Sequence, residues 1–469
     1  MATEQVDVLV AGFGLAGASA ALAAHDAGVR VLVAEKTAAG GGNCRHSGGF
    51  LFSVDGPAAI DHLDALCFGK TDRAVLGAYA EGTTAVADWI AALGGRAPVC
   101  DPDAFPGLLP SWPHFPGAGH VTYRQFDGGP TRPGIALWDL VEDAVRARGI
   151  EVMPETPVTE LVMQDGAVRG AVLDGPDGPR TVRAGAVVLA SGGIEYDPDM
   201  RDAYLPLPLT PVGHPGNTGD SVRLAAQAGA SLWHMAAYFG WVAFAHPDFP
   251  AAFTINVHAP SCVLIDDDGR RFADEFGWEV HDQIRSFTTF HPRHENRPRP
   301  RGFVIFDEAA RLAGPLNGIV GTPNDHRWSA DNSTELEAGW IVGSESPRAL
   351  ARAISVDPDV LEATLAQYAN AVARGRDDLF HRPPETLVAL EPPLYALPIV
   401  AGLATASGGP RRDAHARVLR AGDDGYVPID GLYAAGAAGS IWGHLTEHGG
   451  GLTDAVVFGR IAGAHAAAR

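Results

Sequence analysis

Short apolar runs alternate with a small-residue segment of helical spacing near the start of the chain. Residues 6–11 and 29–34 are the apolar runs, and residues 16–27 between them place apolar positions at helical intervals. A glycine-rich turn separates the first run from the helical segment. The pattern therefore predicts a strand, a tight turn, a helix and a second strand.

The same alternation continues further along and then gives way to a different composition. A helix is predicted over 136–147, a strand pair over 158–172 and a fully apolar strand over 186–190. From about residue 243 to 390, prolines, aromatics and histidines are frequent, and the predicted strands 262–265 and 302–306 are isolated. This change of composition indicates an inserted domain.

The apolar, glycine-rich pattern returns near residue 398 and ends in a helix predicted over 452–467. Such a return indicates one domain that is built from both ends of the chain. We expect this domain to occupy residues 1–242 and 391–469, with the inserted domain at 243–390. The predicted fold class is α/β, with an α+β insertion.

Composition narrows the class of protein. With 469 residues, of which 46% are hydrophobic, the chain has enough apolar material for a large core. A net charge of −21 disfavours binding to nucleic acids. The apolar runs stay shorter than the roughly 20 residues of a membrane-spanning helix, so we expect no membrane insertion and a cytoplasmic location. The four cysteines are scattered, which fits neither a disulfide framework nor a metal site.

The first glycine-rich turn is a candidate site for a pyrophosphate. Gly12, Gly14 and Gly17 follow the first strand, and Leu15 and Ala16 lie between them at the start of the helix. Glycines allow backbone N–H groups and the positive end of the helix to approach the phosphates closely. Taken alone, this turn predicts a dinucleotide without saying which one.

An acidic residue follows at the place where such sites hold the adenosine ribose. Glu35 ends the second strand, where a carboxylate accepts both ribose hydroxyls and repels a 2′-phosphate, and Lys36 comes next. The choice between NAD and FAD depends on four further glycine segments, which are residues 40–49, 191–193, 431–436 and 449–451.

With these segments, the sequence resembles the superfamily of FAD-dependent fumarate reductases, succinate dehydrogenases and 3-ketosteroid dehydrogenases across nearly the whole chain. The resemblance implies a Rossmann-like FAD-binding domain and a capping domain that carries the proton donor or acceptor. It also implies that loop 40–49 wraps the flavin and that the last helix directs its N-terminus at the flavin N1/O2 edge, where the helix dipole stabilises negative charge. In addition to the first turn, Glu35 and Lys36, the expected FAD-binding residues are Gly42, Asn43, Cys44, Ser47, Gly48, Gly49, Ser191, Gly192, Gly193, Thr218, Asp220, Gly436, Gly451 and Leu452.

The resemblance also gives more detailed expectations for the cofactor. Thr218 is expected to face it, and Asp220 is expected to cap the helix that follows. Relatives with covalent FAD carry a histidine early in the flavin loop, whereas this chain has Gly42 or Asn43 there, so non-covalent FAD is expected. The sequence contains no second dinucleotide turn, and the electrons are therefore expected to come from, or leave for, another molecule.

The resemblance places the residue that transfers the substrate proton four positions after Glu275, at Glu279. Fumarate reductases have an arginine at about this place, and 3-ketosteroid dehydrogenases have a tyrosine. A carboxylate beside Trp278 and a flavin would be desolvated, which raises its pKa toward neutrality and suits a general acid or base. A solvated glutamate at a helix start is the alternative interpretation, and His281 is a rival for the role.

Three further residues are candidates for catalysis. Glu447 and His448 precede the last helix, where relatives carry a substrate-binding arginine or tyrosine. We expect His448, together with the Gly451 N–H, to donate to an enolate oxygen of the substrate. Tyr238 could offer an active-site hydroxyl, although core packing is the alternative. No metal site is expected, because His444 and His448 lack the carboxylate spacing of a zinc site.

The predicted function is dehydrogenation of a C–C bond beside a carbonyl, or the reverse reduction, by hydride transfer to or from flavin N5. A cyclic, steroid-like ketone is the expected substrate. One alternative is a carboxylate-specific enzyme that resembles fumarate reductase or tricarballylate dehydrogenase, with Arg411 or Arg412 binding the acid. These two arginines could instead be surface residues or hold the FAD phosphates. The other alternative is a flavin-dependent isomerase or binding module without net redox chemistry.

Overall fold

The computed structural model describes residues 4–105, 108–129, 131–206, 208–257, 259–277, 279–288, 301–317, 321 and 323–469. Two compact units make up the chain. Unit 1 contains Met1–Leu205, Gly213–Tyr238 and Thr405–Arg469, and unit 2 contains Pro206–Val212 and Phe239–Ala404. Both ends of the chain therefore belong to unit 1, and most of unit 2 is inserted between them in the sequence.

An eight-stranded sheet forms the centre of unit 1. Its strands are β1 (Glu4–Ala11), β2 (Val31–Ala34), β5 (Glu151–Met153), β6 (Val158–Gln164), β7 (Ala167–Gly175), β8 (Gly178–Leu189), β18 (Arg417–Gly422) and β19 (Gly425–Ala434). The order is β18-β19-β8-β1-β2-β5, with β7 also pairing with β8 and β6 with β7. The strands from β19 to β5 are parallel to one another, and the pairs β18–β19, β6–β7 and β7–β8 are antiparallel.

The central strands of this sheet are apolar on both faces. Val8, Leu9 and Val10 of β1 are completely buried, as are Val187 and Val188 of β8. A parallel sheet that is covered on both faces requires continuous apolar strands of this kind. The structure thus confirms the strands predicted at 6–11 and 186–190 and explains why they lack an alternating polar face.

Helices and two small sheets complete unit 1. The helices are α1 (Leu15–Asp26), α2 (Ala59–Cys67), α3 (Arg73–Thr84), α4 (Val86–Ala92), α5 (Pro133–Ala147), α6 (Pro198–Tyr204), α7 (Asp220–Gln227) and α12 (Gly450–Ala467). Short 3₁₀ turns lie at Gly42–His46, Pro102–Ala104 and Ala118–His120. Two antiparallel pairs join β3 (Phe50–Val54) to β4 (Val121–Gln125) and β10 (Leu232–Trp233) to β17 (Gly409–Pro410).

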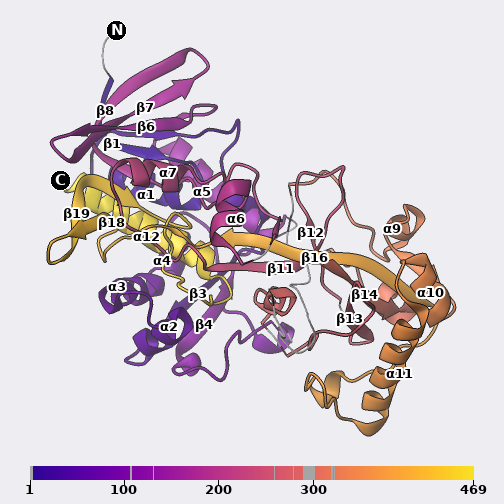
Figure 1. Cartoon of the computed structure of the whole chain (residues 1–469). Coiled ribbons are helices and arrows are strands. Elements are labelled where there is room, and N and C mark those ends of the chain that lie inside the picture. Colours follow the sequence, from indigo (N-terminus) through magenta and orange to yellow (C-terminus); the bar gives the residue numbers. More distant parts are fainter. Residues whose placement is uncertain are drawn as a thin grey trace. The chain divides into compact units, whose positions relative to one another are not determined.

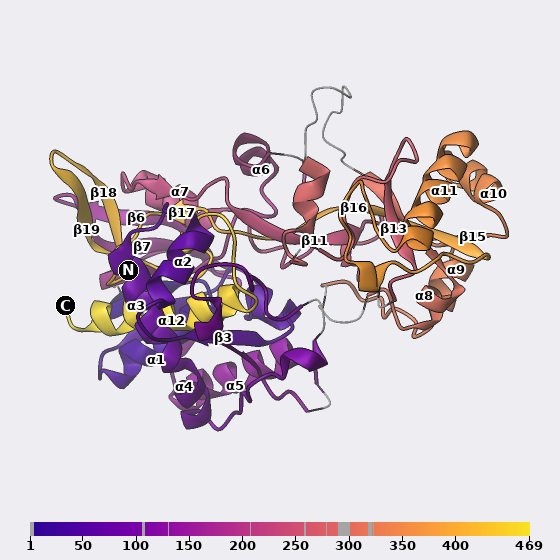
Figure 2. The same cartoon turned by 90° about the horizontal axis from the view of Figure 1, so that it is seen from below.

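Close packing of α1 against α12 joins the two ends of the chain. A Cβ atom at Gly459 would lie 2.5 Å from the carbonyl oxygen of Ala16, and one at Gly463 would lie 2.1 Å from that of Ala20. The two contacts advance together along both helices, so the helices run in the same direction. Figures 1 and 2 show the yellow C-terminal helix beside the indigo N-terminal elements in two perpendicular views.

Unit 2 is built on a seven-stranded sheet. Its strands are β9 (Thr210–Pro211), β11 (Tyr238–Phe244), β12 (Phe253–Thr254), β13 (Cys262–Asp266), β14 (Arg301–Asp307), β15 (Val342–Ser344) and β16 (Leu394–Ala406). The order is β12-β11-β16-β14-β13, and β15 and β9 also pair with β16. Its helices are α8 (Glu308–Leu312), α9 (Ser333–Glu337), α10 (Pro347–Ala353) and α11 (Pro358–Arg374), with 3₁₀ turns at Gln283–Thr288 and Pro384–Thr386.

Local sequence fixes the ends of α11, the longest helix described in unit 2. The Asp357 side chain accepts hydrogen bonds from the N–H groups of Asp359 and Val360 at 2.8 and 3.3 Å, which satisfies donors that have no partner within the helix. Pro358 occupies the first position, where a missing N–H costs nothing, and Gly375 ends the helix at a φ of 62°. Between these ends, Leu361 belongs to the apolar core of the unit.

The boundary on the C-terminal side of unit 2 differs from the one expected at 390/391. The chain stays in unit 2 as far as Ala404, along β16. An apolar strand that continues from one unit into the next carries no change of pattern at the boundary, so the sequence could not locate it. The assignment of the units to FAD binding and to capping stays a prediction. Within the described ranges, no helix combines the length and the apolar character needed to cross a bilayer.

The α1–α12 contact predicts the effect of a methyl group at Gly459. We expect Gly459→Ala to destabilise the protein by about 1–3 kcal/mol, because the added atom forces apart two backbones that cannot adapt locally. Denaturant unfolding measures the change. Gly77→Ala in α3 is the matched control: its Cβ would come no closer than 3.7 Å to a neighbouring side chain, so it should be neutral or stabilising by up to about 1 kcal/mol. Equal effects of the two variants would contradict the contact.

Candidate active site

The glycines of the first turn have different roles. Gly12 has a φ of 108°, and a Cβ there would lie 2.6 Å from Ala190 O; a Cβ at Gly17 would lie 2.0 Å from Gly12 O. Packing within the protein therefore requires both of these glycines. A Cβ at Gly14 would meet only Gly41 O, at 3.9 Å. Among the described residues, none requires a glycine at position 14, so the space beside it is available to a ligand.

A second open glycine lies beside Gly14. The Gly41 N–H donates to Phe13 O at 2.8 Å, which brings the 40–49 loop against the first turn. A Cβ at Gly42 would meet only Gly14 Cα, at 3.9 Å. Partly exposed backbone at Gly14 and Gly42, together with the N–H groups of the first turn of α1, forms a cradle suited to a pyrophosphate. Leu15 and Ala16 supply part of that turn and are themselves buried.

Glu35 and Lys36 connect this cradle to α7. Glu35 accepts hydrogen bonds from Phe13 N at 2.7 Å and from Thr37 N at 2.8 Å. Lys36 Nζ lies 2.6 Å from both Thr218 Oγ1 and Asp220 Oδ2. The expected cap at Asp220 is wrong: Gly219 is the N-cap of α7, with no side-chain cap hydrogen bond, and Asp220 is the first helical residue. Its carboxylate pairs with Lys36 instead.

The remaining predicted residues of the 40–49 loop use their side chains inside the protein. Asn43 Oδ1 accepts from His214 N at 2.7 Å, and Ser47 Oγ donates to Cys44 O at 2.8 Å. Burial raises the pKa of the Cys44 thiol to about 12. A Cβ at Gly48 would lie 3.1 Å from the Phe50 ring, and one at Gly49 would lie 2.5 Å from Pro133 Cβ. This loop can therefore contact a cofactor mainly through its backbone groups.

The second strand-to-glycine turn packs against the first. Ser191 Oγ lies 2.6 Å from Ser221 Oγ, and the residue before it, Ala190, makes the contact that requires Gly12. Gly192 has a φ of 79°, and a Cβ there would lie 2.4 Å from Asn217 Oδ1. A Cβ at Gly193 would lie 2.5 Å from Glu195 Oε1. The turn after β8 thus holds the turn after β1 in place.

The N-terminus of α12 points in the same direction as that of α1 and extends beyond it. The helix begins after Gly449, which has a φ of 82°, and Gly451 is exposed while Leu452 is partly buried. Gly459 lies level with Ala16, so Gly451 lies about 12 Å further along the shared direction, at about 1.5 Å per residue. A Cβ at Gly436 would lie 2.8 Å from Ala16 Cβ, so the turn after β19 lies at the start of α1.

These features fit FAD. If the pyrophosphate of an elongated dinucleotide lies on the cradle at Gly14 and Gly42, the other end of the dinucleotide can reach the N-terminus of α12, at Gly451 and Leu452. Amide N–H groups in the first turn of a helix have no partner within the helix. They can therefore donate to a negatively charged ring edge.

Glu447 is held within unit 1 by two side chains. His62 Nε2 lies 2.8 Å from Glu447 Oε1, and the Tyr123 hydroxyl donates to Glu447 Oε2 at 2.8 Å. Only 1% of the Glu447 side chain is exposed. Both carboxylate oxygens therefore point at the protein interior, and we treat Glu447 as a positioning residue instead of a group that contacts substrate.

His448 and Tyr238 are both buried. The His448 N–H donates to Ser111 Oγ at 3.1 Å, and its ring lies edge-on to Phe50, with the ring centroids 4.3 Å apart. Tyr238 is the last residue of its segment of unit 1 and the first of β11. Their proposed contacts with substrate stay predictions.

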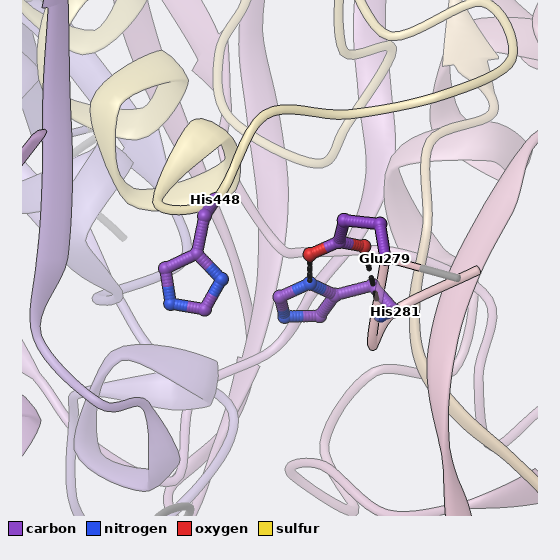
Figure 3. A group of neighbouring side chains, drawn as sticks. All are labelled: Glu279, His281 and His448. Carbon is purple, nitrogen blue, oxygen red and sulfur yellow. Dashed lines mark hydrogen bonds and ion pairs between the residues drawn. The ribbon is translucent and has the colours of Figure 1, made fainter. Parts of the chain in front are cut away.

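Glu279 and His281 form a hydrogen-bonded pair in unit 2, as Figure 3 shows. Glu279 Oε1 lies 2.7 Å from His281 Nδ1, and Glu279 Oε2 accepts from His281 N at 2.8 Å. Burial disfavours the protonated ring, but the charge of Glu279 and its hydrogen bond outweigh burial and raise the pKa of His281. The Trp241 ring lies edge-on to that of His281 at 4.6 Å. Trp278, expected beside Glu279, lies outside the described residues.

Arg412 is not available to bind a carboxylate substrate. It is 1% exposed, pairs with Asp454 of α12 at 2.5 Å, and lies over the Phe458 ring at 3.9 Å. The interpretations of Arg412 as a substrate-binding or a surface residue were therefore wrong. The neighbouring Arg411 stacks on Tyr426 at 4.0 Å. The local sequence gave no sign of the Asp454 partner, which lies 42 positions further along the chain.

Sequence reasoning missed His62, Tyr123 and Ser111, which hold the segment before α12. His62 lies in α2, Tyr123 lies in β4, and Ser111 lies in the segment between α4 and β4. Each is far from residue 447 in the sequence, and none belongs to a recognisable motif. The antiparallel pairing of β3 with β4 places Tyr123, and the Ser111 N–H donates to the Tyr123 oxygen at 3.0 Å.

The open space at Gly14 predicts a selective effect on FAD binding. Gly14→Ala should leave the stability of the FAD-free protein nearly unchanged, because its Cβ would meet only Gly41 O, at an ordinary contact distance of 3.9 Å. It should weaken FAD binding at least about tenfold, or about 1.4 kcal/mol. Fluorescence titration of FAD-free protein measures the affinity. Gly17→Ala is the contrasting variant, and it should lower stability even without FAD. If Gly14→Ala binds FAD normally, the pyrophosphate does not lie there.

Comparisons with known proteins show the family of the chain and agree with FAD as its cofactor. The FAD binding domain family matches residues 7–452. A probable fumarate reductase of Shewanella frigidimarina is 29% identical over 99% of this chain and 75% of its own length. A 3-oxosteroid 1-dehydrogenase of Mycobacterium tuberculosis is 30% identical over 71% of this chain and 63% of its own length.

A solved structure shows the same fold. The crystal structure of 3-ketosteroid delta1-dehydrogenase from Sterolibacterium denitrificans has a TM-score of 0.86 at 22% identity, and the match covers 99% of this chain and 100% of that one. Two observations thus agree: the glycine cradle with its extended helix N-terminus, and the match of the family over most of the sequence. The chain belongs to the FAD binding domain family and is an FAD-dependent oxidoreductase of the kind that acts on CH–CH bonds.

Proposed function

We propose that this enzyme interconverts a saturated cyclic ketone and its enone by acting on the C–C bond beside the carbonyl. When bound, FAD supplies the hydride acceptor or donor for the substrate carbon. A steroid-like ring system is the proposed substrate class, in line with the 3-oxosteroid 1-dehydrogenase among the relatives. The catalytic residues of this chain then have two tasks, which are to move one proton and to polarise the carbonyl.

The observation that carries the choice of a ketone is the chemistry of the segment before α12. Residues 440–452 contain no lysine or arginine. Glu447 directs both oxygens into unit 1, and Arg412 is paired with Asp454. A carboxylate substrate needs a cation that is free to pair with it. A ketone needs only hydrogen-bond donors, which the α12 amides and the His448 ring can supply.

Proton transfer is assigned to the pair Glu279 and His281. The Glu279 carboxylate fixes the orientation of the ring through Nδ1 and favours its protonated form. In dehydrogenation, His281 accepts the proton from the carbon beside the carbonyl, and in reduction it returns the proton. Glu279, the base expected from the sequence, then acts through His281. Tyr238 and His448 are proposed as donors to the substrate oxygen.

Several expectations become part of this proposal. FAD is held non-covalently, because Gly42 and Asn43 stand where a covalent histidine would be needed. An external molecule supplies or removes electrons, and no metal takes part. Unit 1 is the FAD-binding domain, unit 2 is the capping domain, and the protein works in the cytoplasm.

Reduction of a carboxylate substrate is the second candidate, and the probable fumarate reductase among the relatives favours it. An anaerobic substrate panel separates the two. We expect saturated cyclic ketones to bleach the flavin absorbance and the matching enones to restore it. Reoxidation by fumarate alone, or competitive inhibition by di- and tricarboxylates, would exclude the ketone assignment. Turnover without any change in flavin oxidation level would indicate an isomerase.

The Glu279–His281 pair predicts a shift in the pH profile. In Glu279→Gln the charge that raises the pKa of His281 is absent, so this pKa falls. For dehydrogenation, which needs the unprotonated ring, the rising limb of kcat against pH should move to lower pH. We expect kcat at the optimum to fall about 10²-fold, at the lower end for general-base catalysis. FAD affinity should be retained, which shows that the variant is folded. A limb that stays in place would exclude His281.

A further inference from the structure

We propose that His62, Glu447 and Tyr123 form a buried proton-sharing triad that positions the N-terminus of α12 and keeps net charge away from it, thereby setting the flavin reduction potential. The inference rests on the proposed position of the flavin ring at α12. It reassigns Glu447 from catalysis to positioning. None of the three side chains needs to contact FAD or substrate for this role.

The triad is assembled within unit 1 from three separate segments. His62 lies in α2, Tyr123 lies in β4, and Glu447 lies three residues before the start of α12. The side chains of His62 and Glu447 are 0% and 1% exposed, and Tyr123 is also buried. Polar groups buried to this degree need hydrogen-bond partners within the protein.

Hydrogen-bond partners fix where the protons lie. His62 Nδ1 lies 2.8 Å from Pro116 O, which can only accept, so Nδ1 carries a proton. The Ser111 N–H donates to the Tyr123 oxygen at 3.0 Å, which leaves the Tyr123 hydroxyl proton for Glu447 Oε2. Burial and the charge of Glu447 both raise the pKa of Tyr123, so the phenol stays protonated.

One proton must therefore lie between His62 Nε2 and Glu447 Oε1. Without it, two acceptors would face each other at 2.8 Å in a buried site, which is strongly unfavourable. With it, the pair is either imidazolium with carboxylate or imidazole with carboxylic acid. Both arrangements are neutral overall. The carboxylate thus adds no net negative charge near the helix N-terminus.

The triad is connected to the helix by the backbone. Glu447 O accepts from Gly450 N at 2.8 Å. The residues on either side of Glu447 are also held, since Trp112 Nε1 donates to Thr446 O at 2.8 Å and the His448 N–H donates to Ser111 Oγ at 3.1 Å. The positions of the Gly451 and Leu452 amides therefore follow from the position of Glu447.

A net charge near the N-terminus of α12 affects the reduction potential of the flavin. Reduced flavin is stabilised by the positive end of a helix that faces its pyrimidine edge. An uncompensated carboxylate beside that helix end would oppose the stabilisation and make the flavin harder to reduce. Loss of His62 as a partner leaves such a carboxylate, whereas replacement of Glu447 by a neutral isostere does not.

The test uses charge-matched variants of the FAD-loaded protein, with the reduction potential measured against reference dyes. His62→Gln keeps a donor to Glu447 but removes the compensating proton. It should lower the potential by about 30 mV or more, equal to a tenfold change in the ratio of oxidised to reduced flavin. Glu447→Gln can satisfy both neighbours without charge and should keep the potential. The double variant H62Q/E447Q should return the potential toward that of the unchanged protein.

Two controls separate positioning from other roles. His444→Gln, in the same segment but outside the triad, should change neither the potential nor the FAD affinity. Tyr123→Phe leaves the shared proton in place and removes one donor, so it should shift the potential less than His62→Gln. If His62→Gln does not fold, the double variant H62Q/E447Q, which buries no carboxylate at this place, should still fold and bind FAD, and a double variant that also fails to fold would contradict the compensation of charge by His62.

Three results would overturn the proposal. The first is a folded His62→Gln variant with an unchanged potential. The second is a double variant whose potential is no closer to that of the unchanged protein. The third is Glu447→Gln with normal potential and FAD affinity but a hundredfold or greater loss of turnover, which would make Glu447 the acid or base. None of the potential measurements involves substrate, so an incorrect ketone assignment would leave them unaffected.

Discussion

The contact between α1 and α12 is the constraint on which the rest of unit 1 depends. Gly459 and Gly463 allow the two helix backbones to touch, and this close approach fixes both the direction and the axial offset of the helices. One N-terminus then lies at the glycine cradle, and the other lies further along the same direction. An elongated cofactor needs this arrangement, because its two polar ends require separate sets of backbone donors.

Buried, hydrogen-bonded side-chain pairs surround the N-terminus of α12. Arg412 pairs with Asp454 in the first turns of the helix, and His62 and Tyr123 hold Glu447 just before it. Each buried charge has a partner of opposite sign or a shared proton. Buried ionic groups of this kind add little to stability compared with apolar packing, but removal of one member is costly. They are well suited to holding a helix end in one position.

The features that could be predicted from the sequence are those that depend on local pattern and short spacing. The two strands and the helix of the 4–34 segment follow from apolar periodicity, and the glycine turns follow from the need for exposed backbone. The expected cap at Asp220 was wrong because Gly219 is the N-cap of α7, and the Asp220 carboxylate pairs with Lys36, 184 positions away. The roles of Glu447 and Arg412 could not be predicted either. Their partners, His62 and Asp454, are known only once the fold brings distant segments together.

Unit 1 is assembled from three stretches of chain, and the last begins at Thr405. During synthesis from the N-terminus, β1 and α1 emerge early, yet α1 gains its partner only when residues 450–467 have left the ribosome. Unit 2, apart from a short leading segment, is contiguous in sequence and complete before that point. Domains generally fold as units once their residues are available. The newly made protein therefore spends most of its translation with unit 1 unfinished, and the glycine turn before α1 and the N-terminus of α12 come together only late in its biogenesis.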